Sequence, residues 1–336
     1  MIIDWVRTRM GRFVFLLTGS LFVFMPISGV ALSAGLGDYP DRPITLIVPY
    51  PPGGSADFMA RLTAAAFTER TGHRMVVDNR GGAGGNIAAE YVAREKPDGY
   101  TLIMGNAPIL AINPHLYSSI QFDPMEDFQP VTPIAEIPLF LIAHPDAPFD
   151  SVQELVAAAK KDPGLLDYAS GSSGSTTHLG MELFKSMAGV DLMHVPYRGS
   201  GPALAGISAG DVPVMFELMP SALPIIESGR VKVLAATTLE RSPAYPDIPT
   251  VHESGVPDFK MASWFGVLAP AGTPEAIVEY LHAEIRGASQ SEEFKTRLEG
   301  VGALAMSGGP AEFSSLIESE LVRWGEVVEI SGAKAE

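Results

Sequence analysis

The sequence predicts an α/β protein of two domains, each built on a mainly parallel sheet flanked by helices. Short apolar runs alternate with amphipathic helical stretches, which is the pattern of parallel strands covered by helices. The length of 336 residues, of which 46% are hydrophobic, fits two domains with sizeable cores. The chain has no cysteine, so disulfides, thiolate metal ligands and thiol nucleophiles are excluded.

The first 34 residues have the pattern of a cleaved secretory signal peptide. Arg7, Arg9 and Arg12 precede an apolar stretch over residues 13–30, and the small residues over 31–34 are typical of a cleavage site. A membrane anchor is the alternative, but the uninterrupted apolar run is short for a bilayer span. We therefore expect a signal peptide over residues 1–34 and a periplasmic protein.

The following segments alternate between strand and helix patterns. In the first domain, strands are predicted over 44–49, 75–77, 101–104 and 140–143. Helices are predicted over 57–70 and 87–93.

A second group of elements begins near residue 146. Ser151 and Glu154 have capping-box spacing at a helix start. The further elements are a strand near 168, a helix over 176–188 and strands over 212–216 and 231–236.

After about residue 245 the chain is expected to return to the first domain, with a strand over 263–268 and a final helix whose apolar face runs from 313 to 324. The proline-rich segments near 130–148 and 243–257 are the predicted crossovers. This places lobe 1 at 38–144 plus 245–336 and lobe 2 at 145–244.

Two glycine-rich loops of the first domain follow predicted strands and precede predicted helices. Paired glycines let a ligand approach the backbone, and free N–H groups at a helix start favour an anion. The second loop lacks the spacing of a P-loop or a dinucleotide fingerprint. A plain turn capped by Ser55 or Asp57 is the alternative for the first. The candidate ligand-binding residues are Tyr50, Pro52, Gly53, Gly54, Ser55, Gly84, Gly85 and Asn86, with Asn106 after the third strand.

The second domain contributes a hydroxyl-rich run over 170–178 and a glycine-rich loop over 197–202. Hydroxyl and N–H donors at a helix start can clamp a carboxylate, although helix capping by Ser175 and a solvated Arg198 are structural alternatives. A hydrolase with Ser175 as nucleophile and His178 as base is disfavoured, because no Gly-x-Ser-x-Gly elbow surrounds the serine. The candidates here are Ser172, Ser175, Thr176, Thr177, His178, Tyr197, Gly199, Gly201 and Glu217.

Composition restricts partners and cofactors. The formal net charge of −16 argues against nucleic acid and anionic membrane surfaces. The seven histidines are scattered without a His-x-x-x-His pair, so we expect neither a metal nor a cofactor. An anion site in so acidic a chain must be local, built from backbone N–H groups and a few side chains.

A series of short motifs runs in one order over nearly the whole chain after residue 38. They include Val48-Pro49-Tyr50 with Gly53-Gly54, Asn79-Arg80-Gly81, Pro97-Asp98-Gly99-Tyr100, Thr177-His178, Val195-Pro196-Tyr197-Arg198-Gly199 and Ser263-Trp264-Phe265-Gly266. Together they resemble the Bug receptors, the substrate-binding components of tripartite tricarboxylate transporters.

The resemblance implies a type II-like Venus-flytrap fold, in which two α/β lobes close on a small carboxylate held by main-chain donors and ordered waters. It also implies delivery of the ligand to two membrane subunits of a transporter, and assigns the glycine-rich and hydroxyl-rich loops above to the ligand. Glu217 departs from the family, whose strand more often ends in aspartate.

The sequence thus predicts a monomeric extracytoplasmic receptor for a small organic carboxylate, which can be a di- or tricarboxylate or an aromatic or amino-acid carboxylate. A ligand sensor for a membrane signalling partner is the alternative that sequence does not separate from transport. An enzyme acting on a carboxylated substrate is a further alternative, against which the lack of any catalytic constellation argues.

Overall fold

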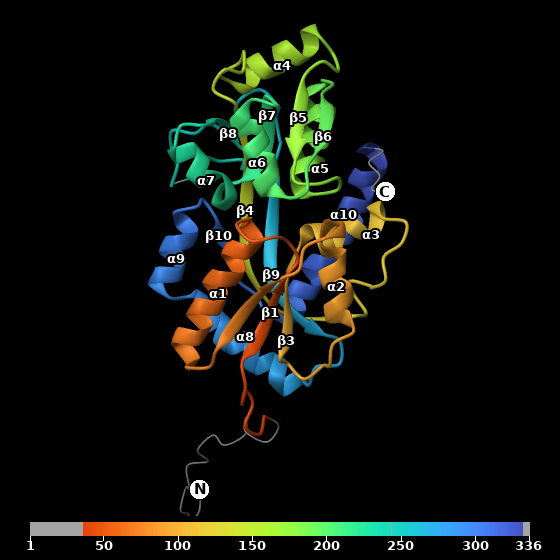
Figure 1. Cartoon of the computed structure of the whole chain (residues 1–336), viewed down its shortest axis with the longest axis vertical. Helices are drawn as coiled ribbons and strands as arrows, with labels where there is room; N and C mark the ends of the chain where they lie inside the picture. Colours follow the sequence, from red (N-terminus) through yellow and green to blue (C-terminus); the bar gives the residue numbers. More distant parts are fainter. Residues whose placement is uncertain (1–35, 243, 332–336) are drawn as a thin grey trace, which may run out of the picture. The chain divides into compact units, whose positions relative to one another are not determined.

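The computed structural model describes residues 36–242 and 244–331. The signal peptide predicted over residues 1–34 lies outside the described residues. A ten-stranded sheet runs through the described part in the order β2-β1-β3-β9-β4-β7-β5-β6, and β8 and β10 also pair with β4. Helices cover the sheet along its length (Figure 1).

The strands fall into two sections that share β4 (Phe128–Ala143). The first section holds β1 (Ile44–Val48), β2 (Met75–Asn79), β3 (Thr101–Asn106), β9 (Ala262–Pro270) and β10 (Leu304–Ala305). The second section holds β5 (Asp167–Ser170), β6 (Met193–Pro196), β7 (Val214–Leu218) and β8 (Lys232–Ala236).

Helices flank each section (Figure 1). Those around the first section are α1 (Ser55–Thr71), the 3₁₀ turn η1 (Ala83–Gly85), α2 (Asn86–Ala93), the π-helix η2 (Pro108–Ile112), α3 (Asn113–Leu116), α8 (Glu275–Ser289), α9 (Glu292–Glu299) and α10 (Pro310–Ser331). Those around the second section are α4 (Val152–Lys161), α5 (Thr176–Ala188), α6 (Ser200–Ala209) and α7 (Met219–Glu227). Helices α7 and α9 were not among the predicted elements.

The sheet is parallel in its outer strands, as predicted. β1 pairs in parallel with β2 and β3, and β5 pairs in parallel with β6 and β7. Where β4 and β9 run side by side between the sections, the pairing is antiparallel, so the whole sheet is mixed. Because the carboxyl ends of parallel strands meet at one edge, the loops after β1, β2 and β3 lie together, as do those after β5 and β6.

The proline-rich segment near 130–138 belongs to a strand and not to a loop. It forms most of β4, which is much longer than the strand predicted over 140–143. Proline cannot donate a ladder hydrogen bond, and strands accept it at bulges and edges. The register of β4 against β9 shifts between Pro130 and Thr132 and again between Pro133 and Ala135, which accommodates two of the prolines.

Local signals place several elements correctly. The Ser151 hydroxyl accepts the Glu154 N–H at the start of α4, which confirms the cap. The predicted helix over 176–188 has the bounds of α5. The last helix is held by a contact that no local pattern shows, since the indoles of Trp264 on β9 and Trp324 on α10 both donate to Glu320 Oε2, at 3.2 and 2.8 Å.

A continuous apolar core follows the sheet through both sections. It includes the three rings of Phe184, Phe216 and Phe259, which pack at centroid distances of 5.7 to 6.1 Å. Of the helices in the described ranges, none combines the length and the apolar character that crossing a bilayer requires.

Candidate functional site

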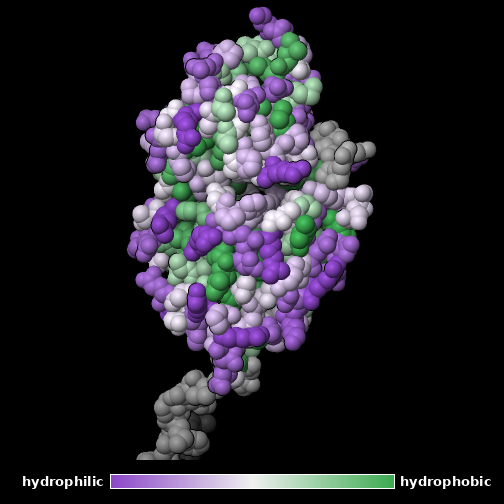
Figure 2. Space-filling model, in the orientation of Figure 1, coloured by the Kyte–Doolittle hydropathy of each residue, from purple (hydrophilic) through white to green (hydrophobic). Residues whose placement is uncertain are grey.

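A cavity of about 400 Å³ is lined by residues from both sections of the sheet. Polar loops and helix starts meet there, at the carboxyl ends of the parallel strands. The face shown in Figure 2 is hollowed between the two parts of the described chain, and mostly hydrophilic and intermediate side chains surround the hollow. A volume of this size suits a small organic molecule.

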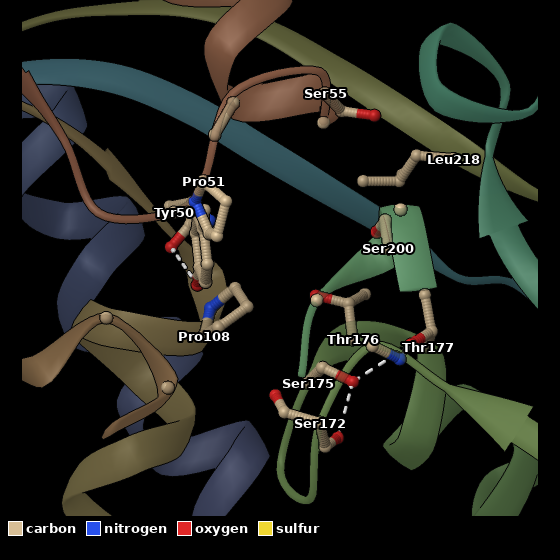
Figure 3. Close-up of a pocket in the computed structure, with 18 of the residues that line it drawn as sticks. Tyr50, Pro51, Ser55, Pro108, Ser172, Ser175, Thr176, Thr177, Ser200 and Leu218 are labelled. Carbon is tan, nitrogen blue, oxygen red and sulfur yellow. Dashed lines mark hydrogen bonds between the residues drawn. The ribbon is translucent and has the colours of Figure 1, made fainter. Parts of the chain in front are cut away.

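The first section supplies one wall from the loops after β1, β2 and β3. The aromatic ring of Tyr50 is held next to Asn106, whose amide lies 3.3 Å from the tyrosine oxygen. Figure 3 shows Tyr50, Pro51 and Pro108 on this side. The predicted residues that line this wall are Tyr50, Pro52, Gly54, Ser55, Gly84, Gly85 and Asn106.

Gly84 and Gly85 have a backbone conformation that explains the glycine content of this loop. Both have positive φ, at 64° and 101°. A Cβ at Gly84 would lie 2.6 Å from the Tyr117 oxygen, and one at Gly85 would lie 2.9 Å from Ile109. Only glycine therefore fits both the turn and the packing at the start of α2.

The second section supplies the opposite wall. Figure 3 shows Ser172, Ser175, Thr176, Thr177 and Ser200 across the cavity from Tyr50. The predicted residues that line this wall are Ser172, Ser175, Thr176, Thr177, Tyr197, Gly199, Gly201 and Glu217.

The hydroxyl-rich loop is ordered by its own hydrogen bonds. Ser175 caps α5 by accepting the His178 N–H, and its hydroxyl donates to the Ser172 carbonyl at 2.8 Å. The Thr177 hydroxyl accepts the Gly171 N–H at 3.1 Å. Thr176 differs, because its buried Oγ1 has no hydrogen-bond partner among the described residues. The loop thus holds a buried hydroxyl without a described partner at the N-terminus of a 13-residue helix.

Glu217 ends β7 in the same wall and is fully buried. Its Oε1 accepts the Leu218 N–H at 2.9 Å and the Ser200 hydroxyl at 3.1 Å. Its Oε2 has no partner within the described ranges. Burial raises the pKa of Glu217 to about 7, although the two hydrogen bonds act in the opposite direction.

A third polar atom without a described partner comes from β9, which pairs with the shared strand β4. Ser263 on β9 lines the cavity, and its buried Oγ has no hydrogen bond to any residue that the structure describes. A buried polar atom without a partner costs about 1–3 kcal/mol. Three such atoms lining one cavity are therefore typical of a site whose partner is a ligand or a water molecule bound with it.

Three of the predicted residues lie close to the cavity but do not line it. The Gly53 N–H donates to Asp57, and the Asn86 side chain accepts from Asn113 at 2.6 Å. The His178 ring accepts the Gly174 N–H at 3.0 Å and stacks on His194 at a centroid distance of 3.9 Å. These residues support the loops and are engaged within the protein.

The geometry of Ser175 and His178 does not support the hydrolase alternative, in which they are nucleophile and base. Burial lowers the pKa of His178 to about 4 and that of His194 to about 3, so both rings are neutral near pH 7. The Ser175 hydroxyl bonds to Ser172 and Thr177 and caps the helix, and the His178 ring faces Gly174 instead. Ser175 and His178 therefore have no contact between hydroxyl and ring of the kind a nucleophile and its base need, and the hydroxyl beside His194 Nε2, at 2.6 Å, is that of Ser170.

Sequence reasoning missed several lining residues, among them Ser200, Leu218, Ser263 and Phe265. Ser200 opens α6 and lies within the segment predicted as a loop over 197–202, so its position beside Gly199 was a usable signal. Ser263 and Phe265 carry no such signal, because they lie within a strand far along the chain. Arg198, predicted to be solvated, is exposed and also borders the cavity.

Among the described residues, no group of three or more histidine, aspartate or glutamate side chains is placed to hold a metal ion.

The chain is similar to known proteins in both sequence and structure. Residues 59–333 match the sequence profile of the family described as the tripartite tricarboxylate transporter family receptor. Protein BugT of Bordetella pertussis is 38% identical to this chain, over 93% of this chain and 96% of BugT. The structure of Rpa4515 of R. palustris with adipate superposes with a TM-score of 0.86 and 40% identity, and covers 88% of this chain and 99% of Rpa4515. The structure of MatC of Rhodopseudomonas palustris with bound malate superposes with a TM-score of 0.80 and 34% identity, and covers 86% of this chain and 100% of MatC.

Proposed function

The chain belongs to the tripartite tricarboxylate transporter receptor family, and from this premise we propose that it captures a linear dicarboxylate in the cavity between its two sheet sections. The family consists of periplasmic solute-binding receptors and not of enzymes, so the chain is a receptor. The two solved relatives that contain adipate and malate support the dicarboxylate class. We further propose that the captured ligand is passed to two membrane subunits of a transporter.

The observation that carries the proposal is the free hydroxyl of Thr176 at the N-terminus of α5, opposite the glycine-rich loops. Helix N-termini favour anions because their first N–H groups point outward and the helix dipole adds positive potential. A carboxylate at this place satisfies the threonine without any lysine or arginine clamp. The net charge of −16 is therefore no obstacle to anion binding.

We propose that ligand binding brings lobe 1 (38–144 plus 245–336) and lobe 2 (145–244) together. The ligand-facing loops come from both, so a ligand makes all its contacts only in the closed form, which shifts the open–closed equilibrium. The hydroxyls of Ser55 on α1 and Ser221 on α7 lie 2.7 Å apart and are buried, which supplies a direct link across the two sections.

The proposed function predicts a thermal shift with linear dicarboxylates such as adipate and malate. A ligand at ~100 times its Kd adds about 2.7 kcal/mol to the free energy of unfolding. Adipamide, which has the length of adipate without its charges, is the matched control and should give no shift. The radius of gyration from small-angle scattering should fall with a ligand that binds. No shift with any carboxylate, or a shift that needs a divalent metal, would contradict the proposal.

We propose that residues 1–34 direct export and are then removed. The arginines before the apolar stretch and the small residues over 31–34 support this. N-terminal sequencing of protein from the periplasm should find a start between about residues 32 and 37. An intact chain that begins at Met1 and sediments with membranes would contradict this assignment.

A further inference from the structure

The two carboxyl oxygens of Glu217, a residue that lines the cavity, differ in their hydrogen bonds. Both donors that reach it, the Leu218 N–H and the Ser200 hydroxyl, go to Oε1. Oε2 is buried and has no hydrogen bond to a described residue. An ionised carboxylate with one unmatched oxygen is costly to bury, whereas a neutral carboxyl there needs only one acceptor.

The charges on the elements packed around β7 do not neutralise Glu217. They are Glu136 on β4, Asp167 on β5, Glu182 and Lys185 on α5, Arg198 before α6 and Glu227 on α7. Within the described chain, none of them forms an ion pair or a hydrogen bond with Glu217, and Lys185 is paired with Glu182 at 2.9 Å. Burial without a cation raises the pKa of Glu217 to about 7.

The other titratable rings nearby keep one protonation state between about pH 6 and about pH 9. Burial lowers the pKa values of His178 and His194, so both are neutral in this range. Burial raises the pKa values of Tyr50, Tyr168 and Tyr197, so all three stay protonated. Glu217 therefore changes its charge in this window while the rings around it do not.

The hydrogen bonds also locate the proton of the neutral acid. Oε1 accepts from two donors and so acts as the carbonyl oxygen, which leaves the proton on Oε2. In that form Oε2 is a donor in the cavity wall, and a carboxylate is the acceptor with which an O–H group makes its strongest hydrogen bond. An ionised Glu217 would instead repel a carboxylate.

We propose that Glu217 is a specificity-determining residue that binds a ligand carboxylate as a protonated acid, so that capture of the ligand takes up one proton from solvent. The proposal rests on the proposed function, and it deepens that function by selecting carboxylates over ligands that place an ammonium group at this position. An ammonium group needs the ionised form of Glu217 and would release the proton. The two ligand classes therefore give opposite pH dependences.

The test is calorimetric titration of the full mature chain with adipate and with malate at about pH 6, about pH 8 and about pH 9. The protonated form binds, so affinity should be highest below the pKa of about 7 and fall about tenfold per pH unit above it. This gives a Kd about 100-fold weaker at pH 9 than at pH 6. Titrations at pH 8 in two buffers of different ionisation enthalpy should show uptake of close to one proton per ligand.

The Glu217→Gln variant carries a permanent neutral donor in place of the acid. It should lose the pH dependence and the proton uptake, and at pH 9 it should bind about 100-fold more tightly than the unmodified chain. Glu227→Gln is the matched control, because it removes an exposed carboxylate from the same section, at the far end of α7. Its pH profile should match that of the unmodified chain.

The outcomes separate the two levels of the proposal. If neither dicarboxylate binds at pH 6, the proposed function fails and this inference fails with it. If one binds with a flat pH profile, or more tightly as pH rises, only the role of Glu217 is overturned. The same holds if Glu217→Gln keeps the pH profile of the unmodified chain.

Discussion

Replacing Thr176 with valine is expected to weaken dicarboxylate binding by about 10- to 100-fold while the free energy of unfolding stays the same or rises slightly. A hydrogen bond to a charged partner contributes about 1.5–3 kcal/mol, which corresponds to this loss of affinity. Thr176 Oγ1 is buried in the cavity wall and has no hydrogen bond to the rest of the described chain, so its removal costs the free protein nothing. Calorimetry and urea denaturation on the same protein measure both quantities.

Thr63 offers the matched control. Its Oγ1 is also buried without a described partner, but it lies in α1 and does not line the cavity. Thr63→Val should therefore leave both affinity and stability close to those of the unmodified chain. Ser175→Ala provides the contrast, because loss of this cap should lower the free energy of unfolding by ~1 kcal/mol. Unchanged affinity in Thr176→Val would show that the ligand does not use this hydroxyl.

Glu320→Ala is expected to lower the free energy of unfolding by about 2–5 kcal/mol. One carboxylate oxygen accepts from the indoles of Trp264 and Trp324, and Oε1 pairs with Arg323 at 3.0 Å. Truncation leaves two buried indole N–H groups without this acceptor and loosens α10 from β9. Because β9 also carries Ser263 and Phe265, affinity should fall as well.

Glu318→Ala serves as the control for Glu320→Ala. It removes an exposed glutamate from the same helix and should change the free energy of unfolding by less than about 0.5 kcal/mol. Glu320→Gln keeps one oxygen that can accept from both indoles. Its free energy of unfolding should lie between those of Glu320→Ala and Glu318→Ala. If Glu320→Ala is as stable as Glu318→Ala, the shared acceptor does not hold the last helix in place.

Local sequence was sufficient for most of the wall residues. A strand, a glycine- or hydroxyl-rich loop and a helix start follow each other in the segments around Tyr50, Gly84 and Thr176. Parallel pairing brings the ends of such strands to one edge, and the residues of all three loops line the cavity. Capping by Ser175 was likewise predictable, because it depends on the N–H of His178, only three residues along the chain.

The resemblance of the ordered motifs to the Bug receptors identified the family, which the match over residues 59–333 confirms. Local patterns gave a wrong prediction for the prolines of β4, which were expected in a crossover and lie in a strand. A proline-rich segment usually breaks a strand, and only pairing with β9, with its two register shifts, explains how β4 continues through it.

What the sequence by itself determined is the α/β class, the family and the chemistry of the loops, because these depend on residues close together in the chain. The tertiary structure alone decided which polar atoms keep a free bonding position. Thr176, Glu217 and Ser263 come from a helix, a strand end and a strand far along the chain, and no local pattern shows that their oxygens are buried without described partners. Burial and the supply of partners depend on distant segments brought together by folding, and these two quantities set the pKa of Glu217.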